Sequence, residues 1–202
     1  MVKIRRAEIS DSECLCFLIA EAIEDLIFYM TGFSERQAAL EQLLEWIKCE
    51  DTRVSYRNCL VAEESGEVLG AVLYYKGDDA ERLDEPLNRH LSAMGSEERL
   101  HTECRPGEMY ADAIAVMPQA RGRGIAAQLL NGVCQRAREE EIDTVSLLVD
   151  LEKPRVQALY ERCGFCDDGL FPLAGHRYRR MIKKSVRSKT SGLSSGSSTN
   201  RT

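Results

Sequence analysis

The segment Gln119-Ala120-Arg121-Gly122-Arg123-Gly124-Ile125-Ala126 connects an apolar stretch at residues 109–117 to a stretch of good helix formers at residues 124–138. Its glycines allow the backbone to approach an anion closely, and the first turn of a helix offers N–H groups that lack intrahelical partners. Its two arginines add charge-assisted hydrogen bonds. The segment therefore suits a pyrophosphate, and the alternative is an ordinary strand–helix connection with solvated arginines.

A second interpretation of this segment is a dinucleotide site. Residues 122–127 also match the GxGxxA fingerprint, and Asp150 follows near the end of the next expected strand. In dinucleotide-binding domains, however, the first strand leads almost directly into the first glycine. Here residues 118–121 intervene, and three strands are expected earlier in the chain. The context favours a different phosphate-binding fold.

The patterns on both sides of the segment predict alternating strands and helices. Ser10 and Glu13, at capping-box spacing, predict the start of the first helix, and Thr31-Gly32 predicts its end. The long polar stretch at residues 77–107 is expected to be a functional or partly disordered excursion. In chain order, we expect a strand at residues 2–5, helices at 15–30 and 34–47, strands at 59–62, 68–73 and 109–117, a helix at 124–138, a strand at 144–149, a helix at 154–162, and a final pair of strands that includes 178–182.

This order predicts the fold class and the domain organisation. A strand, helix, strand and helix in succession imply one central, right-handed parallel βαβ unit in an otherwise antiparallel sheet, here with an N-terminal helical hairpin: a mixed α/β fold. The length of 202 residues suits one domain, which we place at residues 1–183. Residues 184–202, rich in Ser and basic residues, are predicted to be a disordered tail. Their GxSxG match at residues 192–196 lacks a flanking strand and helix, so we assign it no role.

The composition excludes several functional classes. A formal net charge of −6 argues against binding nucleic acid or an anionic membrane. No stretch reaches the roughly 18 apolar residues of a membrane span, and no apolar signal core follows Met1, so we expect a cytoplasmic protein. The eight cysteines are then expected to be reduced thiols. Cys163 and Cys166 form the only CxxC, without a second ligand pair, so no metal site is expected.

Two motifs resemble those of the GNAT superfamily of acetyl-CoA-dependent N-acetyltransferases. The family's signature is Gln/Arg-x-x-Gly-x-Gly/Ala between a strand and a helix, and residues 121–126 fit it. The resemblance extends upstream through Ala113-Ile114-Ala115-Val116 and downstream to Leu159-Tyr160-Glu161-Arg162-Cys163-Gly164-Phe165, which is similar to the family's second block. The order of the expected elements also matches the family over residues 1–183. Two motifs at the expected separation are more specific than one.

The resemblance implies a reaction and a set of binding residues. It implies acetyl-CoA as co-substrate and direct acetyl transfer to an amine. In this family the fourth and fifth strands separate, and the pantetheine arm lies in the gap, bonded to the backbone of the fourth strand. Tyr160 matches a tyrosine near the acyl-CoA sulfur, where a phenol can protonate the departing thiolate; the alternative for Tyr160 is a core aromatic. The implied contacts are Ile114, Ala115 and Val116 for the pantetheine arm, and Arg121, Gly122, Arg123, Gly124, Ile125 and Ala126 for the pyrophosphate.

Direct transfer also needs a group that accepts a proton from the amine, either a base or a water chain. Strand alternation places Glu108, Tyr110 and Asp112 on one face of the expected strand, where the acceptor would enter. Glu108 and Asp112 are therefore candidate bases, and the alternative is that both acids are solvent-facing strand residues.

One position departs from the family pattern. Where the second block usually begins with asparagine, this chain has Lys153, which either reaches a phosphate of CoA or is solvated at the helix start. The acidic stretch at residues 77–108 favours a cationic acceptor. The alternative function is a non-catalytic acyl-CoA-binding sensor. Neither the acceptor nor the oligomeric state follows from the sequence.

Overall fold

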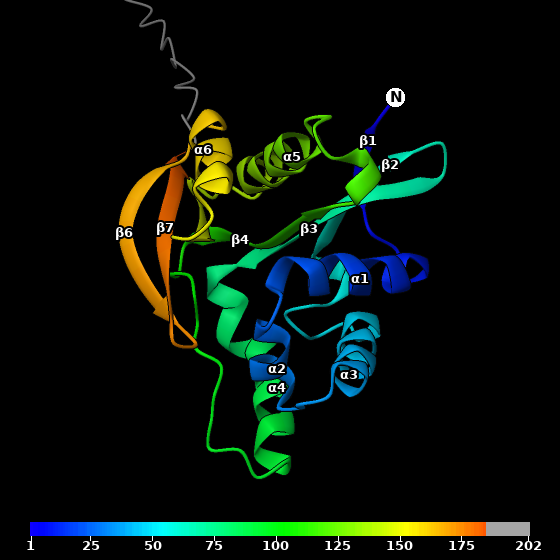
Figure 1. Cartoon of the computed structure of the whole chain (residues 1–202). Coiled ribbons are helices and arrows are strands. Elements are labelled where there is room, and N and C mark those ends of the chain that lie inside the picture. Colours follow the sequence, from blue (N-terminus) through cyan, green and yellow to red (C-terminus); the bar gives the residue numbers. More distant parts are fainter. Residues whose placement is uncertain (185–202) are drawn as a thin grey trace, which may run out of the picture.

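The computed structural model describes residues 1–184, which form a seven-stranded sheet with the order β1-β2-β3-β4-β5-β7-β6 (Figure 1). Neighbouring strands are antiparallel except for β4 and β5, which are parallel. This confirms the predicted mixed sheet with one parallel βαβ unit. Of the predicted tail, only residue 184 is among the described residues. The GxSxG match at residues 192–196 lies outside them. The strands are β1 (Lys3–Arg6), β2 (Cys59–Glu64), β3 (Glu67–Lys76), β4 (Glu108–Val116), β5 (Thr144–Asp150), β6 (Cys166–Leu173) and β7 (His176–Lys184).

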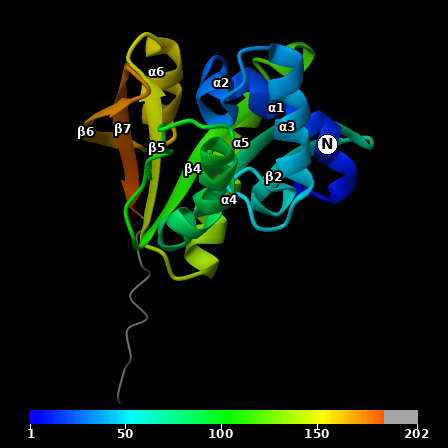
Figure 2. The same ribbon diagram turned by 90° about the horizontal axis from the view of Figure 1, so that it is seen from below.

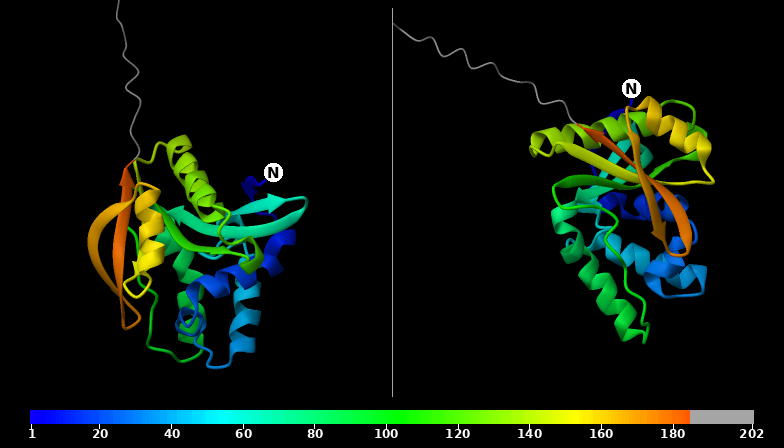
Figure 3. Two further views of the ribbon diagram at one scale, coloured as in Figure 1. Left: turned by 45° about the horizontal axis from the view of Figure 1, so that its top comes forward. Right: turned by 90° about the vertical axis from the view of Figure 1, so that its left-hand side faces the viewer.

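Helices cover both faces of the sheet (Figures 1 and 3). α5 and α6 lie on one face, and α1 to α4 lie on the other, so that each face has its own apolar core. No helix within residues 1–184 is both long enough and apolar enough to cross a membrane. The helices are α1 (Ser12–Ile23), α2 (Leu26–Thr31), α3 (Arg36–Lys48), α4 (Ala80–Ala93), α5 (Ile125–Glu139) and α6 (Pro154–Arg162), with short 3-10 turns at Ile9–Asp11, Tyr56–Asn58, Gly77–Asp79 and Pro118–Ala120.

The N-terminal helices differ from the prediction in two respects. The apolar stretch at residues 15–30 forms two helices, α1 and α2, because the chain turns at Glu24, whose φ is 50°. The predicted cap by Ser10 and Glu13 is wrong, since α1 is preceded by a 3-10 turn whose capping box joins Glu8 and Asp11. The predicted end at Thr31-Gly32 is confirmed: Gly32 terminates α2 in the left-handed conformation. Apolar spacing alone did not reveal the break because both helices pack against α3.

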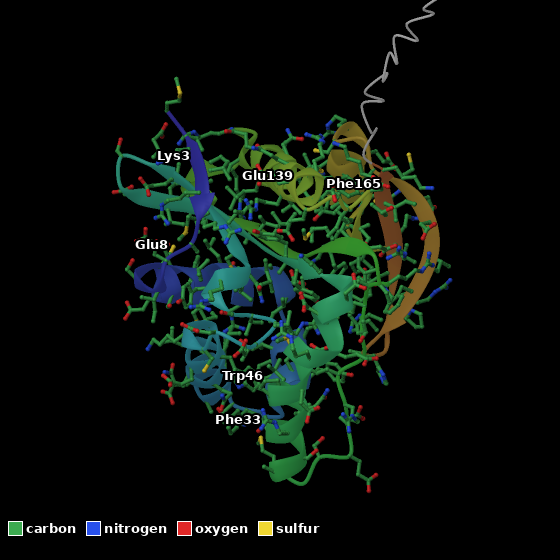
Figure 4. The ribbon with its side chains drawn as sticks, turned by 180° about the vertical axis from the view of Figure 1, so that it is seen from behind. Lys3, Glu8, Phe33, Trp46, Glu139 and Phe165 are labelled. Carbon is green, nitrogen blue, oxygen red and sulfur yellow. The ribbon has the colours of Figure 1, made fainter. Side chains whose placement is uncertain are left out.

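The polar stretch at residues 77–107 contains α4, a helix that the sequence analysis did not predict. The charged residues on its exposed face concealed an apolar stripe. Ring contacts hold the C-terminal half of α4, since the ring of His90 packs against those of Phe33 and Trp46, with centroids 5.7 and 5.2 Å away. Figure 4 labels Phe33 and Trp46. The buried leucines of α4 recur at four-residue spacing: Leu83, Leu87 and Leu91.

The parallel pairing of β4 and β5 covers only one end of β4. Residues 108–111 pair with residues 144–147, and beyond them the two strands diverge (Figure 2). The register between β3 and β4 shifts at Asp112, which occupies a β-bulge. The bulge switches the faces of β4, since Ala111 lies in the core on the α5 side and Ala113 in the core on the α1 side. Beyond the bulge, β4 therefore has an edge that β5 does not cover.

Candidate active site

A cavity of about 230 Å³ lies where β4 and β5 diverge. Ile114 of β4 lines one side, and Val149 of β5 and Tyr160 of α6 line the other. The α1–α2 corner and the segment between α4 and β4 close the remaining sides, and the latter contributes Glu103. The cavity thus joins the uncovered edge of β4 to polar side chains from several elements, as is common for sites where neighbouring strands separate.

The predicted pyrophosphate segment forms a turn at the start of α5. Gly122 and Gly124 have φ values of 80° and 75°, and Gly124 is the N-cap of α5. A Cβ on either glycine would meet nothing within 4 Å, so the backbone conformation, not lack of space, requires glycine there. Arg121 Nε donates to a β4 carbonyl at 3.2 Å, and Arg123 forms an ion pair with Glu64 at 2.6 Å. The first-turn N–H groups, which lack intrahelical partners, therefore meet here with the side chain of Arg121, which forms no ion pair within residues 1–184.

The three β4 residues predicted to contact the cofactor form the uncovered edge. Ile114, Ala115 and Val116 pair with β3 on one side, and within residues 1–184 no strand pairs with them on the other. Such an edge presents backbone N–H and C=O groups that can bond an extended ligand. Ile125 of the turn is buried in the α5 core, so only its backbone is available to a ligand.

Tyr160 lies on α6 in the cavity wall and is 9% exposed. Its ring is 6.3 Å from that of Phe165. Burial raises the pKa of the phenol to about 12, so the hydroxyl keeps its proton at neutral pH. A free thiol has a pKa of about 8.5, so Tyr160 is better suited to stabilise a departing thiolate by a hydrogen bond than to lose its proton completely.

A buried arginine stands beside the cavity. Arg53, in the loop between α3 and β2, is 3% exposed and contacts three carboxylates. Its Nη2 lies 2.8 Å from both Asp112 Oδ2 and Glu103 Oε1, and its Nη1 lies 3.3 Å from Asp84 Oδ1. The ring of Tyr75 lies 5.6 Å from the guanidinium carbon. One positive charge is therefore shared by three carboxylates, which we call the Arg53 cluster.

Arg53 and Glu103 were not among the predicted site residues. Glu103 Oε2 accepts a hydrogen bond from the Tyr110 hydroxyl at 2.7 Å. Burial raises the pKa of both Glu103 and Asp84 above the ordinary values, and the charge of Arg53 only partly offsets this. No signal in the sequence identifies Arg53 or Glu103, because each stands in an irregular segment without a motif or an apolar period.

The three β4 residues expected on one face separate in the structure. Tyr110 and Asp112 line the cavity, whereas Glu108 is not among its lining residues. Glu108 lies where β4 and β5 still pair, and it accepts hydrogen bonds from Arg180 Nη2 at 2.5 Å and Ser146 Oγ at 2.9 Å. The carboxylate of Glu108 thus ties β4 to β5 and β7. The geometry favours Asp112, at the bulge, over Glu108 as a group that meets the acceptor.

Lys153 occupies the N-cap of α6 and lines the cavity. Its Nζ lies 2.9 Å from Glu24 Oε2, so it is ion-paired. The pair connects the α1–α2 corner to the β5–α6 corner. Because both side chains are largely exposed, the pair contributes little to stability.

The cysteines and acidic residues of the described chain do not suggest a metal centre. All eight cysteines stand as free thiols in the structure. Among residues 1–184, no three His, Cys, Asp or Glu side chains are grouped so as to hold a metal ion. The reactive groups that the cavity brings together include the phenol of Tyr160, the imidazole of His101 and the carboxylates of Asp112 and Glu103.

The sequence matches a known family over most of its length. A model of the acetyltransferase (GNAT) family matches residues 19–165, which include the bulge, the glycine turn and Tyr160. Among curated proteins, the spore coat polysaccharide biosynthesis protein SpsD of Bacillus subtilis (strain 168) is 25% identical over 158 residues. That match covers 78% of this chain and 45% of the relative, so the chain spans less than half of that protein's length.

Solved structures share the fold. A crystal structure of an acetyltransferase is 29% identical, with a TM-score of 0.74 over 90% of this chain and 98% of that one. An N-acetyltransferase from Staphylococcus aureus Mu50 is 23% identical, with a TM-score of 0.78 over 90% and 100%. A polyamine N-acetyltransferase of Drosophila melanogaster is 20% identical, with a TM-score of 0.58 over 92% and 100%, and shows the fold alone. The chain belongs to the acetyltransferase (GNAT) family.

Proposed function

We propose that the enzyme transfers an acetyl group from acetyl-CoA directly to an amine bound in the cavity between β4 and β5. The observation that carries this proposal is that one cavity joins the uncovered edge of β4 at Ile114, the phenol of Tyr160 and the carboxylate of Asp112. In a direct transfer, a C–N bond forms as the thioester C–S bond breaks. The amine loses one proton, and the departing CoA thiolate gains one.

The glycine turn and the β4 edge supply the cofactor contacts in this proposal. The N–H groups of residues 122–126 hold the pyrophosphate, since the Arg121 N–H already donates to the Pro118 carbonyl, and the backbone of residues 114–116 bonds the amides of the pantetheine arm. Arg121 adds its charge at the turn. Arg123 contributes chiefly through its backbone, because its side chain is already paired with Glu64. Acetyl-CoA itself supplies the activated acyl group.

Asp112 is the proposed proton acceptor. The bulge places it on the cavity wall next to the uncovered edge, where the reacting carbonyl would lie. From there it can take the amine proton directly or through one water. Arg53, bonded to Asp112 through both Nε and Nη2, fixes the orientation of the carboxylate. Glu108, the other acid predicted for this role, is engaged by Arg180 and Ser146 instead.

Tyr160→Phe tests the hydrogen bond that we propose the Tyr160 hydroxyl donates to the departing thiolate. Removal of the hydroxyl should lower kcat about 100-fold, because the thiolate then departs without a hydrogen bond, while the KM for acetyl-CoA changes little. Steady-state release of free CoA thiol measures both constants. Wild-type turnover in this variant would remove Tyr160 from the mechanism.

Thermal shift and CoA release together test the proposed function. Acetyl-CoA should raise the melting temperature, and a primary amine should then accelerate thiol release. One relative is named for polysaccharide biosynthesis and one structural neighbour for polyamine acetylation, so the amines should include an amino sugar and a polyamine. Stabilisation by acetyl-CoA, with no amine accelerating release above the buffer rate, would favour the acyl-CoA-binding sensor instead.

The setting of the reaction belongs to the same proposal. We assign catalysis to a single domain at residues 1–183 and place it in the cytoplasm, without a nucleic acid or membrane partner. The formal net charge of −6 supports the absence of polyanionic partners. The acceptor is expected to be cationic, because acidic side chains predominate around the cavity.

A further inference from the structure

The charges that line the cavity do not balance. Both lining cations are already paired with lining carboxylates: Arg53 with Asp112 and Glu103, and Lys153 with Glu24. Against these two cations stand five carboxylates, an excess of three formal negative charges. The five lining carboxylates are Glu21, Glu24, Glu103, Asp112 and Asp150.

Glu103 lies on a segment that hydrogen bonds tie to α2 and α4. The segment that carries it is anchored by Asn88 of α4, whose Oδ1 accepts a hydrogen bond from the Leu100 amide at 2.8 Å. The Tyr29 hydroxyl of α2 donates to the carbonyl of Arg99, also at 2.8 Å. These bonds fix the backbone on the approach to Glu103. Its carboxylate is therefore positioned before any ligand arrives, which is what a binding residue requires.

Asp112 and Glu103 form a pair of neighbouring anions. They come from different elements but contact the same Nη2 of Arg53, so their carboxylates are separated by less than two hydrogen-bond lengths. Burial raises the pKa of Glu103; the charge of Arg53 counteracts this, and the charge of Asp112 raises it further. The single positive charge of Arg53 therefore does not neutralise the two carboxylates of Asp112 and Glu103.

The reacting amine cannot supply the missing charge during the reaction. It must be neutral when it attacks the thioester, so its own positive charge has gone by then. A second cationic group on the same acceptor would keep its charge throughout. The cavity, at about 230 Å³, fits a small molecule of this kind.

Building on the proposed acetyl transfer, we propose that the acceptor is a small amine with a second positive charge, and that Glu103 is the specificity-determining residue that binds this charge. The reacting nitrogen then lies beside Asp112, and the second cationic group lies beside Glu103. The two nitrogens of a short alkyl diamine fit the separation of these neighbouring carboxylates.

Two amines of equal chain length test this inference in the wild-type enzyme. 1,4-Diaminobutane carries a second amino group, charged at neutral pH, that butylamine lacks. CoA release should give a kcat/KM for the diamine at least about tenfold above that for the monoamine. Glu103→Gln should bring this ratio close to one, mainly through a higher KM for the diamine. Glu97→Gln changes the net charge equally, on the same segment but outside the cavity, and should leave the ratio unchanged.

The outcomes separate this inference from the function on which it rests. Equal efficiency with both amines in the wild type, or equal effects of Glu103→Gln and Glu97→Gln on the ratio, would overturn the inference and leave acetyl transfer intact. No CoA release with any amine would overturn both. The wild-type comparison of the two amines needs no variant. If Glu103→Gln folds poorly, Glu103→Asp replaces it in the test. Because Glu103→Asp keeps the negative charge, it should retain the preference for the diamine in part.

Discussion

Two buried arginines contact β4, one at its first residue, Glu108, and one at its bulge, Asp112, and their surroundings differ in charge. Arg180 of β7 pairs with Glu108 at 2.5 Å and with Asp168 at 2.8 Å, and Arg105 reaches Asp168 at 3.1 Å. This Arg180 cluster has two cations and two anions, and it lies where β4 and β5 remain paired. The Arg53 cluster has one cation and three anions, and it lies where the strands have diverged.

The difference shows which of the two clusters the cavity uses. Buried charges are costly unless they are paired, so a cluster that only ties strands together is expected to be neutral. The Arg180 cluster meets that expectation and lies away from the cavity. The Arg53 cluster keeps two carboxylates in excess, and two of its acids face the cavity. Uncompensated buried charge beside a cavity is typical of a site that a ligand completes.

The largest expected effect comes from removing each arginine. Arg53→Met leaves three carboxylates without a cation, two of them on the cavity wall, and should lower the free energy of unfolding by about 3–5 kcal/mol at pH 7. Arg180→Met should cost less, about 2–3 kcal/mol, because Glu108 keeps its hydrogen bonds from Ser146 and the Arg105 amide. Urea unfolding measures both losses.

A double variant sharpens this test. Glu103→Gln in the Arg53→Met background removes one of the stranded charges and should restore part of the lost stability. The same substitution in the Arg180→Met background should restore none, since Glu103 does not contact that cluster. A larger loss of unfolding free energy in Arg180→Met than in Arg53→Met, or no recovery in the Arg53→Met/Glu103→Gln double variant, would mean that the charge imbalance is not real.

Matched carboxylate-to-amide changes on β4 should separate catalysis from stability. Asp112→Asn should lower kcat about 100-fold, because the amide cannot take the amine proton. Glu108→Gln should keep kcat within about threefold of wild type but lose about 1–3 kcal/mol of stability through its buried hydrogen bonds. Steady-state CoA release and urea unfolding on the same preparations provide the comparison. A greater loss of turnover in Glu108→Gln than in Asp112→Asn would indicate that Glu108, and not Asp112, accepts the amine proton.

The parts of the site that could be predicted are encoded by neighbouring residues. The strand, the glycine turn and the helix that follows it are consecutive, so turn chemistry and helix-start rules sufficed to predict them. Gly122 and Gly124 adopt positive φ values at this turn, a conformation that glycine tolerates without strain. Tyr160 could be singled out because it belongs to a second local motif. Its place in the cavity wall depends on how α6 packs after β5, which the structure shows.

The parts that could not be predicted depend on contacts between distant residues. Arg53 lies 59 positions from Asp112 and 50 from Glu103, so no local pattern connects them. The bulge is set by the register of β4 against β3, which the alternation of β4 alone does not reveal. For that reason strand alternation grouped Glu108 with Asp112, although their environments differ completely.

The contributions of the two clusters to the free energy of unfolding should change with pH in opposite directions. This is the smallest of the expected effects. Burial holds the pKa of Glu103 and Asp84 above the ordinary values of 4.5 and 3.8, so the unfolded chain releases these protons more readily than the folded one. Their contribution to stability is therefore complete below those ordinary values and is lost as pH rises. The hydrogen bond from Arg180 holds the pKa of Asp168 below 3.8, so its contribution is present above that value and is lost as pH falls through the folded-state pKa.

Carboxylate-to-amide variants allow these opposite pH dependences of the unfolding free energy to be measured. The free energy of unfolding of Glu103→Gln, relative to wild type, should increase as pH rises from 4.5 towards 7, since the variant lacks the acid whose ionisation favours the unfolded chain. The free energy of unfolding of Asp168→Asn should fall furthest below that of wild type at pH 7. The difference should shrink as pH falls below 3.8. Urea unfolding at several pH values gives both slopes. Slopes of the same sign would show that the Arg53 cluster is as well compensated as the Arg180 cluster, and the case for a second cation on the acceptor would lose its physical basis.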